Sequence, residues 1–257
     1  MTWHDTIGGL LAGRSAIVTG AASPRGLGFG IARALAAAGA RVSLLDLDEA
    51  AVSAAAEQLP GSGHLGFACD VTRPEPCCET VARIAEATGG VDVLVNNAGV
   101  SQPRKLMEID QAGYDLVLDV SLRGALNMCQ AASPHLRRPG ASIICMGSVS
   151  GERGGGVMGG PHYSAAKSAV HGFARALARE LGADGIRVNA IAPGLIDTDL
   201  IAGRLPDAAR ARVIESVPLG RIGIPADVAG AALFLASDLS AYVTGTTLDV
   251  NGGLHIH

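Results

Sequence analysis

The chain has 257 residues, of which 48% are hydrophobic and 17% charged, and its formal net charge at pH 7 is −4 with histidine counted as neutral. This length and apolar content suffice for one large core, so we expect a single domain over residues 1–257. The lack of a basic excess argues against a nucleic-acid partner, because phosphate binding requires clustered cations. No run of about 18 uncharged apolar residues occurs, so we expect no membrane span or membrane partner.

The N-terminal segment and the cysteines bear on the compartment. Residues 1–14 carry an acid and no early basic cluster, unlike a secretory signal. The five cysteines form no CxxC pair, which favours reduced thiols in a cytoplasmic protein. Cys77 and Cys78 are adjacent, which raises the alternative of a metal site. We predict no metal site, because neighbouring helical side chains diverge and no further ligands stand at usable spacing.

Short apolar runs alternate with alanine-rich stretches of helical pattern along the chain. We expect strands at residues 15–19, 41–45, 64–69, 91–95, 142–146, 187–191 and 246–250. We expect helices at residues 28–38, 49–59, 74–88, 110–136, 162–181 and 226–236. This alternation predicts βαβ units with right-handed crossovers, and so a parallel sheet of about seven strands with helices on both faces. The predicted fold class is α/β, a single-domain Rossmann-type doubly wound fold.

Two segments stand outside this alternation. Residues 151–160 (GERGGGVMGG) are glycine-rich, and we expect them to be mobile. Residues 195–217 carry little strand pattern and follow a Pro-Gly turn. We interpret this second segment as a lid over a substrate, with a plain surface excursion as the open alternative.

The first expected strand runs directly into a glycine-rich turn. Gly20, Gly26 and Gly28 lie between a strand and a helix. Glycine there permits a tight turn and a close approach of the backbone to a pyrophosphate, which the free N–H groups of the helix start then bind. A purely structural turn is the alternative, but the position after the first strand of an α/β pattern favours a dinucleotide site.

Asp46 ends the second expected strand, at the place where a carboxylate accepts hydrogen bonds from the adenosine ribose. Its charge also repels the 2′-phosphate of NADP. A helix N-cap is the alternative role, which Asp48 can equally supply. Arg25 favours NADP instead, since a cation attracts the 2′-phosphate of that cofactor. We weigh Asp46 more heavily, because its charge lies against the ribose itself, and predict NAD over NADP.

Further motifs follow in order along the chain. They are CDVT at 69–72, NNAG at 96–99, YSAAK at 163–167, APG at 192–194 and PLGRIGIPADVAGAALFLASDLSAYVTGTTLDVNGG at 218–253. Together with the glycine-rich turn they resemble the short-chain dehydrogenase/reductase family, from Ser15 to Gly253. Each motif alone is modest, but five or more in the family's order are specific. The resemblance implies an NAD(P)-dependent oxidoreductase.

The resemblance also assigns roles to residues. Asp70 and Val71 would contact the adenine, the 97–99 segment would shape the cofactor groove, and Ile196 and Thr198 would hold the nicotinamide carboxamide. The predicted cofactor-binding residues are Gly20, Arg25, Gly26, Leu27, Gly28, Asp46, Asp70, Val71, Asn97, Ala98, Gly99, Tyr163, Lys167, Pro193, Ile196 and Thr198. The family is usually a homotetramer or dimer. Its interfaces use helices equivalent to 110–136 and 162–181 and the C-terminal segment.

Tyr163 and Lys167 stand four residues apart and so share one helix face. A free phenol has a pKa of about 10, too high for a base near neutrality. A nearby ammonium and the positive nicotinamide favour the phenolate and lower that pKa. Tyr163 can then exchange the proton of an alcohol as hydride leaves carbon, while Lys167 holds the nicotinamide ribose. The alternative is a Tyr/Lys pair on the surface without a catalytic role, and the other motifs argue against it.

A serine is expected to position the substrate oxygen, and GSVSG offers Ser148 and Ser150. Ser148 occupies the family's position just after the strand, although its spacing to Tyr163 is slightly long. Ser150 restores the usual spacing but lies further into the loop. We choose Ser148 as catalytic together with Tyr163 and Lys167.

The chain departs from the family pattern at two places. The glycine-rich turn is longer than usual, so an insertion such as Pro24-Arg25 is expected to reshape it. Ser121 stands where the family has an asparagine that supports a water linking the lysine to solvent. Ser121 can still hold a water, so we assign it to a possible, rearranged proton relay.

We therefore predict an NAD-dependent enzyme that interconverts a secondary alcohol and a ketone, acting on a small molecule. Arg153 and His162 lie close to Tyr163 in the sequence and suggest a polyol, sugar or sugar-acid substrate. A 3-oxoacyl thioester reductase that uses NADPH is an alternative, and it would need a basic surface for an acidic carrier. A weakly active cofactor-binding scaffold or regulator is an alternative of another class, supported mainly by Ser121.

Overall fold

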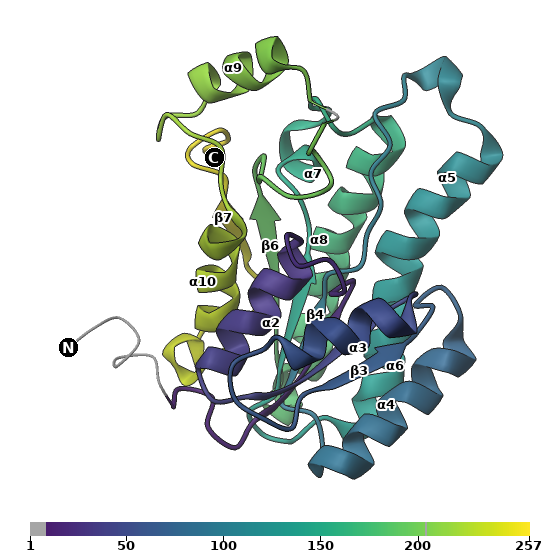
Figure 1. The fold of residues 1–257 in the computed structure, drawn as a ribbon, viewed down its shortest axis with the longest axis vertical. Helices are drawn as coiled ribbons and strands as arrows, with labels where there is room; N and C mark the ends of the chain where they lie inside the picture. The colour runs from purple at the N-terminus through teal and green to yellow at the C-terminus, as the bar shows by residue number, and fades with distance from the viewer. Residues whose placement is uncertain (1–8, 204) are drawn as a thin grey trace.

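A computed structural model describes residues 9–203 and 205–257, so the prediction about the N-terminal segment falls mostly outside the described residues. A parallel sheet forms the centre, with strand order β3-β2-β1-β4-β5-β6-β7 (Figure 1). Its strands are β1 (Ser15–Thr19), β2 (Arg41–Asp46), β3 (Leu65–Ala68), β4 (Val93–Asn96), β5 (Ser142–Met146), β6 (Arg187–Pro193) and β7 (Thr247–Val250). The strand order reverses between β1 and β4, as in a doubly wound sheet.

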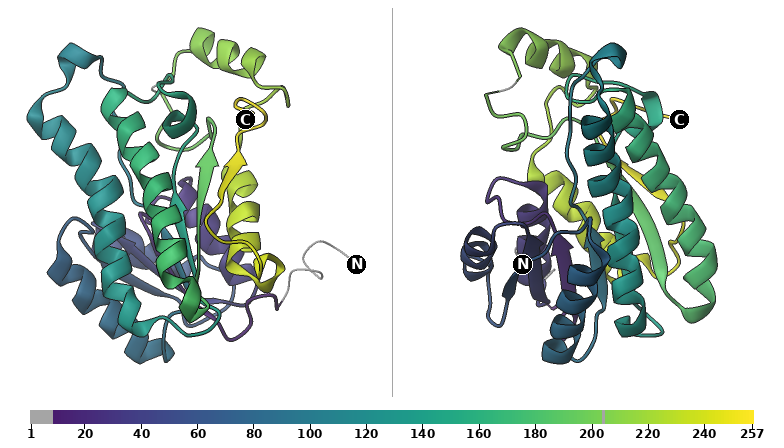
Figure 2. Two further views of the ribbon diagram at one scale, coloured as in Figure 1. Left: turned by 180° about the vertical axis from the view of Figure 1, so that it is seen from behind. Right: turned by 90° about the vertical axis from the view of Figure 1, so that its right-hand side faces the viewer.

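Helices cover both faces of the sheet, as the two further views show (Figure 2). They are α2 (Leu27–Ala37), α3 (Glu49–Glu57), α4 (Pro74–Thr88), α5 (Gln111–Leu118), α6 (Gly124–Ala132), α7 (Ser150–Arg153), α8 (Pro161–Leu181), α9 (Asp207–Ser216) and α10 (Pro225–Ala236). Buried side chains of α2, α3 and α10 pack on one face, and those of α4, α6 and α8 pack on the other. The predicted fold class and its seven parallel strands are confirmed.

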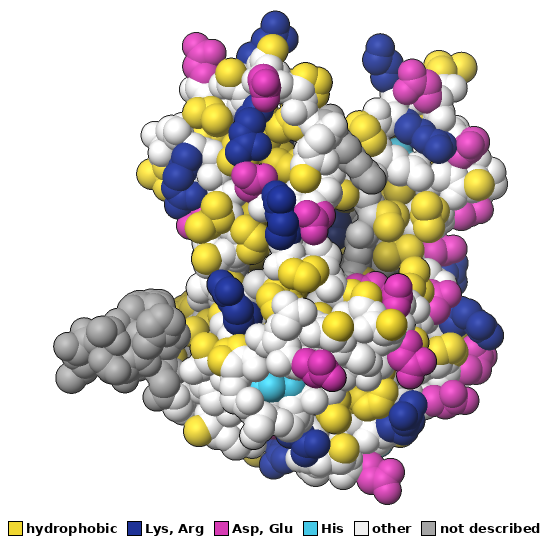
Figure 3. All heavy atoms as spheres, in the orientation of Figure 1, with side chains coloured by type: hydrophobic (Ala, Val, Ile, Leu, Met, Phe, Trp, Pro, Cys, Tyr) yellow, Lys and Arg dark blue, Asp and Glu magenta, His cyan; other side chains and the backbone are white. Residues whose placement is uncertain are grey.

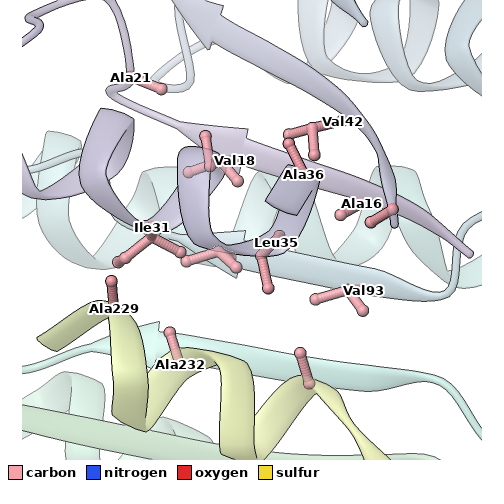
Figure 4. Close-up of a cluster of buried hydrophobic side chains, with 14 of the residues drawn as sticks. Ala16, Val18, Ala21, Ile31, Leu35, Ala36, Val42, Val93, Ala229 and Ala232 are labelled. Carbon is pink, nitrogen blue, oxygen red and sulfur yellow. The ribbon is translucent and has the colours of Figure 1, made fainter. Parts of the chain in front are cut away.

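The central strands are buried over their whole length, which explains their nearly continuous apolar sequence. The edge strands β3 and β7 are only partly buried. On one face, Ile31 and Leu35 of α2 pack between the sheet and the alanines of α10 (Figure 4). Gly30 of α2 lies so close to α10 that a Cβ there would come within 2.8 Å of Pro225 Cβ. Small residues thus let the two helices approach closely over the sheet.

The expected helix at 110–136 is interrupted in the structure. A π-helical segment, Asp119–Arg123, joins α5 to α6, and the N–H of Gly124 donates to the carbonyl of Asp119. A short 3₁₀ turn, Ser133–His135, follows α6. The apolar pattern alone missed this break, because a π turn adds one residue without removing the apolar face. Such turns recur at functional sites, and this one carries Ser121.

The two segments outside the alternation also contain helices. α7 opens the glycine-rich segment, and α9 lies within residues 195–217. α9 buries none of its side chains, so it lacks the apolar stripe from which a helix is read in sequence. Within the described part of the chain, no helix is long and apolar enough to cross a membrane.

Leu35→Ala tests the packing of α2 on the sheet. Because the Leu35 side chain is fully buried, we expect the free energy of unfolding to fall by about 2–5 kcal/mol. Urea unfolding followed by circular dichroism measures it. Leu47→Ala is the matched control: this leucine is 72% exposed, so a change within about 0.5 kcal/mol is expected. Equal losses in the two variants would contradict the described packing.

Candidate active site

The main cavity, of about 530 Å³, lies at the carboxyl ends of β4, β5 and β6, where ligands bind in open α/β sheets. The molecular surface is hollowed there, between the lobe that carries α9 and the lobe that precedes α5 (Figure 3). The predicted site residues that line it are Gly26, Leu27, Asn97, Gly99, Ser148, Tyr163, Lys167, Pro193, Ile196 and Thr198. One cavity thus brings together residues from five separate stretches of the chain.

Other predicted residues lie outside the lining of this cavity. They are Gly20, Arg25, Gly28, Asp46, Asp70, Val71, Ala98 and Ser121. Asp46 and Asp70 follow β2 and β3, which lie beyond β1 along the same edge of the sheet. The carboxylate of Asp70 accepts hydrogen bonds from the N–H and hydroxyl of Thr72. The carbonyl of Val71 accepts one from Asn127 Nδ2, at 2.8 Å.

The glycine-rich turn is fixed by close backbone contacts. Gly20 has a φ of +64°, and a Cβ on Gly28 would overlap the carbonyl oxygen of Gly20. Asn97 Nδ2 donates to the carbonyls of Thr19 and Gly20, both at 2.9 Å. α2 begins after Gly26, and no side chain caps its free N–H groups. The turn therefore offers an uncapped helix start that suits a phosphate.

The longer turn reaches the segment at 195–217. The Gly26 N–H donates to the Ser23 carbonyl, which closes the extra turn. The Ser23 hydroxyl donates to the Asp199 carboxylate at 2.6 Å, and Arg25 Nε lies 3.3 Å from the same group. The inserted residues therefore join the cofactor turn to the segment that lines the cavity, and the Arg25 charge faces Asp199.

The structure separates the two candidate roles of Asp46 and Asp48. Asp48 is the N-cap of α3, and its Oδ1 accepts from Ala51 N–H at 3.0 Å. Asp46 accepts from the N–H of Ala22 at 2.9 Å and from that of Leu47 at 2.8 Å. A carboxylate has about four lone-pair positions, so Asp46 keeps acceptor capacity beside the glycine-rich turn.

Tyr163 and Lys167 lie one turn apart on α8, with Lys167 Nζ 5.9 Å from the centre of the Tyr163 ring. Lys167 is buried, and its Nζ donates to the carbonyl of Met146 at 2.8 Å. Burial lowers the pKa of Lys167 to about 8. Burial also raises the pKa of Tyr163, against a hydrogen bond with Ser148 that lowers it. In the protein alone, burial is therefore the larger effect on the Tyr163 pKa and Ser148 the opposing one.

Ser148 and Ser150 both line the cavity with Tyr163, and Ser148 lowers the pKa of Tyr163 against the effect of burial. Ser148 follows β5, and its Oγ also accepts from the N–H of Ser150 at 3.1 Å. The Ser150 hydroxyl lies near Gly156 and Gly159, where added Cβ atoms would be 3.4 Å and 3.5 Å from it, and Gly159 in turn borders the Tyr163 ring. The choice of Ser148 over Ser150 as the serine that positions the substrate therefore stays a prediction.

Sequence reasoning missed two features that hold this group in place. His171 follows Lys167 by one turn, and its Nε2 accepts from the N–H of Ser148 at 3.4 Å. Burial lowers the pKa of His171 to about 4, so the imidazole is neutral at pH 7. Gly159 lies against Tyr163, since a Cβ there would be 2.6 Å from the ring Cδ1. His171 follows Tyr163 and Lys167 at i+8 and i+4 spacing, so the sequence could have placed it on the same face of α8. No sequence pattern indicated the contact of Gly159 with the ring.

Ser121 lies near the ammonium of Lys167. A Cβ on Gly99 would be 3.2 Å from Lys167 Nζ and 3.7 Å from Ser121 Oγ, so both groups border Gly99. Ser121 is buried, and its hydroxyl has no hydrogen-bond partner among residues 9–203 and 205–257. A buried hydroxyl without a partner is suited to bind a water.

His162 does not belong to the cavity lining, contrary to the expectation that it helps bind a polar substrate. It is buried, and its Nε2 lies 3.3 Å from Gln102 Oε1. His162 occupies the first turn of α8, where it points away from the face that carries Tyr163. Arg153 does line the cavity.

Comparison with known proteins identifies the family. A family model described as enoyl-(acyl carrier protein) reductase matches residues 20–255. An uncharacterised short-chain type dehydrogenase/reductase of Sinorhizobium fredii is 47% identical over 252 residues, covering 96% of this chain and 100% of the relative. The 3-oxoacyl-[acyl-carrier-protein] reductase of Escherichia coli is 38% identical over 245 residues, covering 95% of this chain and 98% of the relative.

A solved structure agrees with these relatives. A short-chain dehydrogenase/reductase of Brucella melitensis, described as a glucose/ribitol dehydrogenase, superposes with a TM-score of 0.88 at 32% identity. The match covers 97% of this chain and 100% of that one. The chain belongs to the short-chain dehydrogenase/reductase family, whose members are oxidoreductases that use nicotinamide cofactors and act on small molecules.

Gly159→Ala tests the packing behind Tyr163. The added methyl group displaces the ring, and a displacement of about 1 Å at a reacting group costs on the order of 100-fold in rate. Cofactor oxidation with the best ketone substrate measures the loss. Gly172→Ala, on the helix that carries Tyr163 and with open space around it, is expected to keep full activity. Wild-type turnover by Gly159→Ala would refute the contact.

Lys167→Met tests the cost of the buried ammonium. Because the folded pKa of about 8 lies below the usual 10.5, the unfolded chain binds more protons between these values. Wild-type stability therefore rises with pH across this window. At pH 7 we expect the free energy of unfolding of Lys167→Met to exceed that of the wild type by on the order of 1 kcal/mol. This difference should vanish as the pH approaches 10.5. Urea unfolding at several pH values measures this difference. Lys105→Met, at an exposed lysine, is the control and should have the same pH dependence of stability as the wild type.

Proposed function

We propose that the protein is an NAD-dependent oxidoreductase that interconverts a secondary alcohol and a ketone. The observation that carries the proposal is the grouping of Ser148, Tyr163 and Lys167 in one cavity at the carboxyl edge of the sheet. The uncapped start of α2 suits a pyrophosphate. The family model and the relatives support the reaction class.

In this mechanism Ser148 donates a hydrogen bond to the substrate oxygen, and Tyr163 exchanges the proton of that oxygen. A nicotinamide held beside Tyr163 and Lys167 would supply the hydride chemistry in either direction. Lys167 holds the nicotinamide ribose, and its charge opposes the rise that burial gives the Tyr163 pKa. His171 positions Ser148 through its backbone N–H. Ser121 holds a water that passes protons between Lys167 and solvent.

NAD is the cofactor we propose. Asp46 retains acceptor capacity beside the glycine-rich turn, and its charge would oppose a 2′-phosphate. Arg25, the cation that would favour NADP, faces Asp199 instead. The remaining residues of the predicted cofactor set keep the roles that the family resemblance implies.

The cavity wall bears on the substrate. Many lining side chains are apolar, namely Val100, Met146, Val149, Val157, Met158, Leu195, Ile196, Leu200, Ile201, Val213 and Leu254. Arg153 supplies a cation to the same wall. We propose an alcohol or ketone with an apolar body and a polar or anionic end at Arg153, covered by residues 195–217 as a lid. The polar residues near Tyr163 in the sequence suggested a polyol or sugar acid. The largely apolar cavity wall supports that hypothesis less well.

A 3-oxoacyl thioester is the second candidate substrate. The apolar wall and the named Escherichia coli relative favour it. The face in Figure 3 intersperses Lys and Arg with Asp and Glu rather than presenting one basic patch for an acidic carrier. A small thioester therefore fits this surface better than a carrier-bound one.

The quaternary structure and the compartment are also proposals. Tyr114, Leu116 and Leu126 are exposed on α5 and α6, and burying them in a homotetramer or dimer would remove apolar surface from water. The five cysteines are all free thiols, which supports a reducing compartment such as the cytoplasm.

Tyr163→Phe tests the proton transfer. Removing the hydroxyl should lower kcat by about 10²–10⁴-fold, while NADH, followed by its fluorescence, still binds. Tyr114→Phe, an exposed tyrosine of α5, is the control and should keep full turnover. The assay compares polyols, sugar acids, apolar hydroxy acids and small 3-oxoacyl thioesters in both directions. Unchanged kcat in Tyr163→Phe would remove this residue from the mechanism.

Asp46→Asn tests the cofactor preference. Neutralising the carboxylate removes its repulsion of a 2′-phosphate, so the ratio of kcat/KM for NAD to that for NADP should fall about tenfold, equivalent to about 1.4 kcal/mol. Glu49→Gln removes the same charge from the exposed start of α3 and should leave the ratio unchanged. A wild-type protein that strongly prefers NADP would overturn the assignment of Asp46.

A further inference from the structure

The C-terminal tail, residues 254–257, returns to α7 beside the wall of the main cavity. There one ligand-type atom from each of Glu152, His255 and His257 lies within 4.8 Å of the others. His255 Nε2 is 3.1 Å from His257 Nδ1 and 4.0 Å from Glu152 Oε2. We propose that these three residues bind a divalent cation of the zinc class, which fastens the tail to α7.

The spacing suits such a cation. Zinc bonds to imidazole nitrogen and carboxylate oxygen are about 2.0–2.2 Å long, which places neighbouring tetrahedral ligands about 3.4 Å apart. The two separations from His255 Nε2 lie on either side of this value. The Glu152 carboxylate and the two imidazoles have to move closer together to reach coordination distance, and a water then completes the tetrahedron.

Asp249 of β7 supplies the outer support that ligating histidines require. His257 Nε2 lies 3.0 Å from Asp249 Oδ2. Metal-bound histidines commonly donate their second ring N–H to a carboxylate, which fixes the tautomer. When Nε2–H of His257 donates to Asp249, Nδ1 carries the lone pair, and that is the atom that faces His255. The imidazole is thus oriented for coordination.

Glu152 has a buried carboxylate oxygen in need of a partner. Its Oε2 makes no hydrogen bond within the described part of the chain, although its side chain is only 11% exposed. A buried carboxylate oxygen without a partner is costly unless a cation compensates for its charge. The proposed ion supplies that positive charge.

The donor set selects the kind of ion. Two imidazoles and one carboxylate suit Zn²⁺, Co²⁺ or Ni²⁺, whereas Mg²⁺ and Ca²⁺ prefer sites built from oxygen alone. A second cavity, lined by Asp249, Asn251 and His255 among others, leads to the cluster. The sequence predicted no metal site, because Glu152 and the two histidines are about a hundred residues apart and meet only in the fold.

The site borders the substrate end of the main cavity. Arg153 Nη1 donates to the carbonyl of Leu254 at 3.2 Å, and both residues line that cavity. An ion held by Glu152 and His255, their direct neighbours, would therefore fix the wall that carries Arg153. The role is structural, takes no part in hydride transfer, and does not rest on the proposed function.

The test uses the full-length chain without an affinity tag, stripped of metal with EDTA. Titration with ZnCl₂ in a calorimeter should show one equivalent bound, and the thermal midpoint should rise by several degrees and fall again with EDTA. Mg²⁺ should do neither. Co²⁺ should give the visible absorption of a tetrahedral N/O site. A chain that binds no stoichiometric Zn²⁺ and keeps its thermal midpoint overturns the proposal.

Variants assign the site. His255→Asn and Glu152→Gln should each abolish the Zn²⁺-induced shift, and Asp249→Asn should weaken binding about 10–100-fold. Circular dichroism confirms that each variant folds. His135→Asn and Cys78→Ser, which change a histidine and an exposed thiol elsewhere, should bind as the wild type does. Wild-type binding by His255→Asn, or loss of binding in Cys78→Ser, refutes the assignment.

Discussion

The parallel alignment of the seven strands is the constraint on which the rest of the molecule depends. Every strand ends at the same edge, so every connection that leaves that edge begins beside its neighbours. The turn after β1, the NNAG motif after β4, Ser148 after β5 and the Pro-Gly turn at β6 all start there. Where the order reverses, between β1 and β4, two connections leave to opposite faces. Asn97 holds them together by donating to the carbonyls of Thr19 and Gly20.

The same edge concentrates unfavourable electrostatics. Lys167 is buried as a cation with one carbonyl acceptor, and Tyr163 beside it is harder to ionise than a free phenol. His171 on the same helix face is neutral at pH 7. Packing elsewhere, such as that of α2 and α10 on the sheet (Figure 4), offsets the destabilisation from this cluster. Strain of this kind is expected where a fold keeps reactive groups away from water.

Parts of the site follow from sequence because they are local. The spacing of Tyr163 and Lys167 and the uncapped glycine turn each depend on a few neighbouring residues, and the structure places Tyr163, Lys167 and Gly26 around one cavity. His162 fails for a related reason: proximity to Tyr163 in sequence does not set direction on a helix, and it lies outside the cavity. The π turn at Ser121 and the contact of Gly159 with the Tyr163 ring arise from packing across the fold.

The sequence by itself determined the order and type of the strands and the doubly wound α/β fold, because hydrophobic periodicity and turn chemistry are encoded over short windows. The tertiary structure decided which aspartate caps α3 and which remains beside the glycine turn. It also decided the bonding of the inserted turn to Asp199 and the meeting of Glu152 with the C-terminal histidines. Those contacts join residues far apart in the chain, so no local pattern records them, and only the packing of the sheet and its helices brings them together.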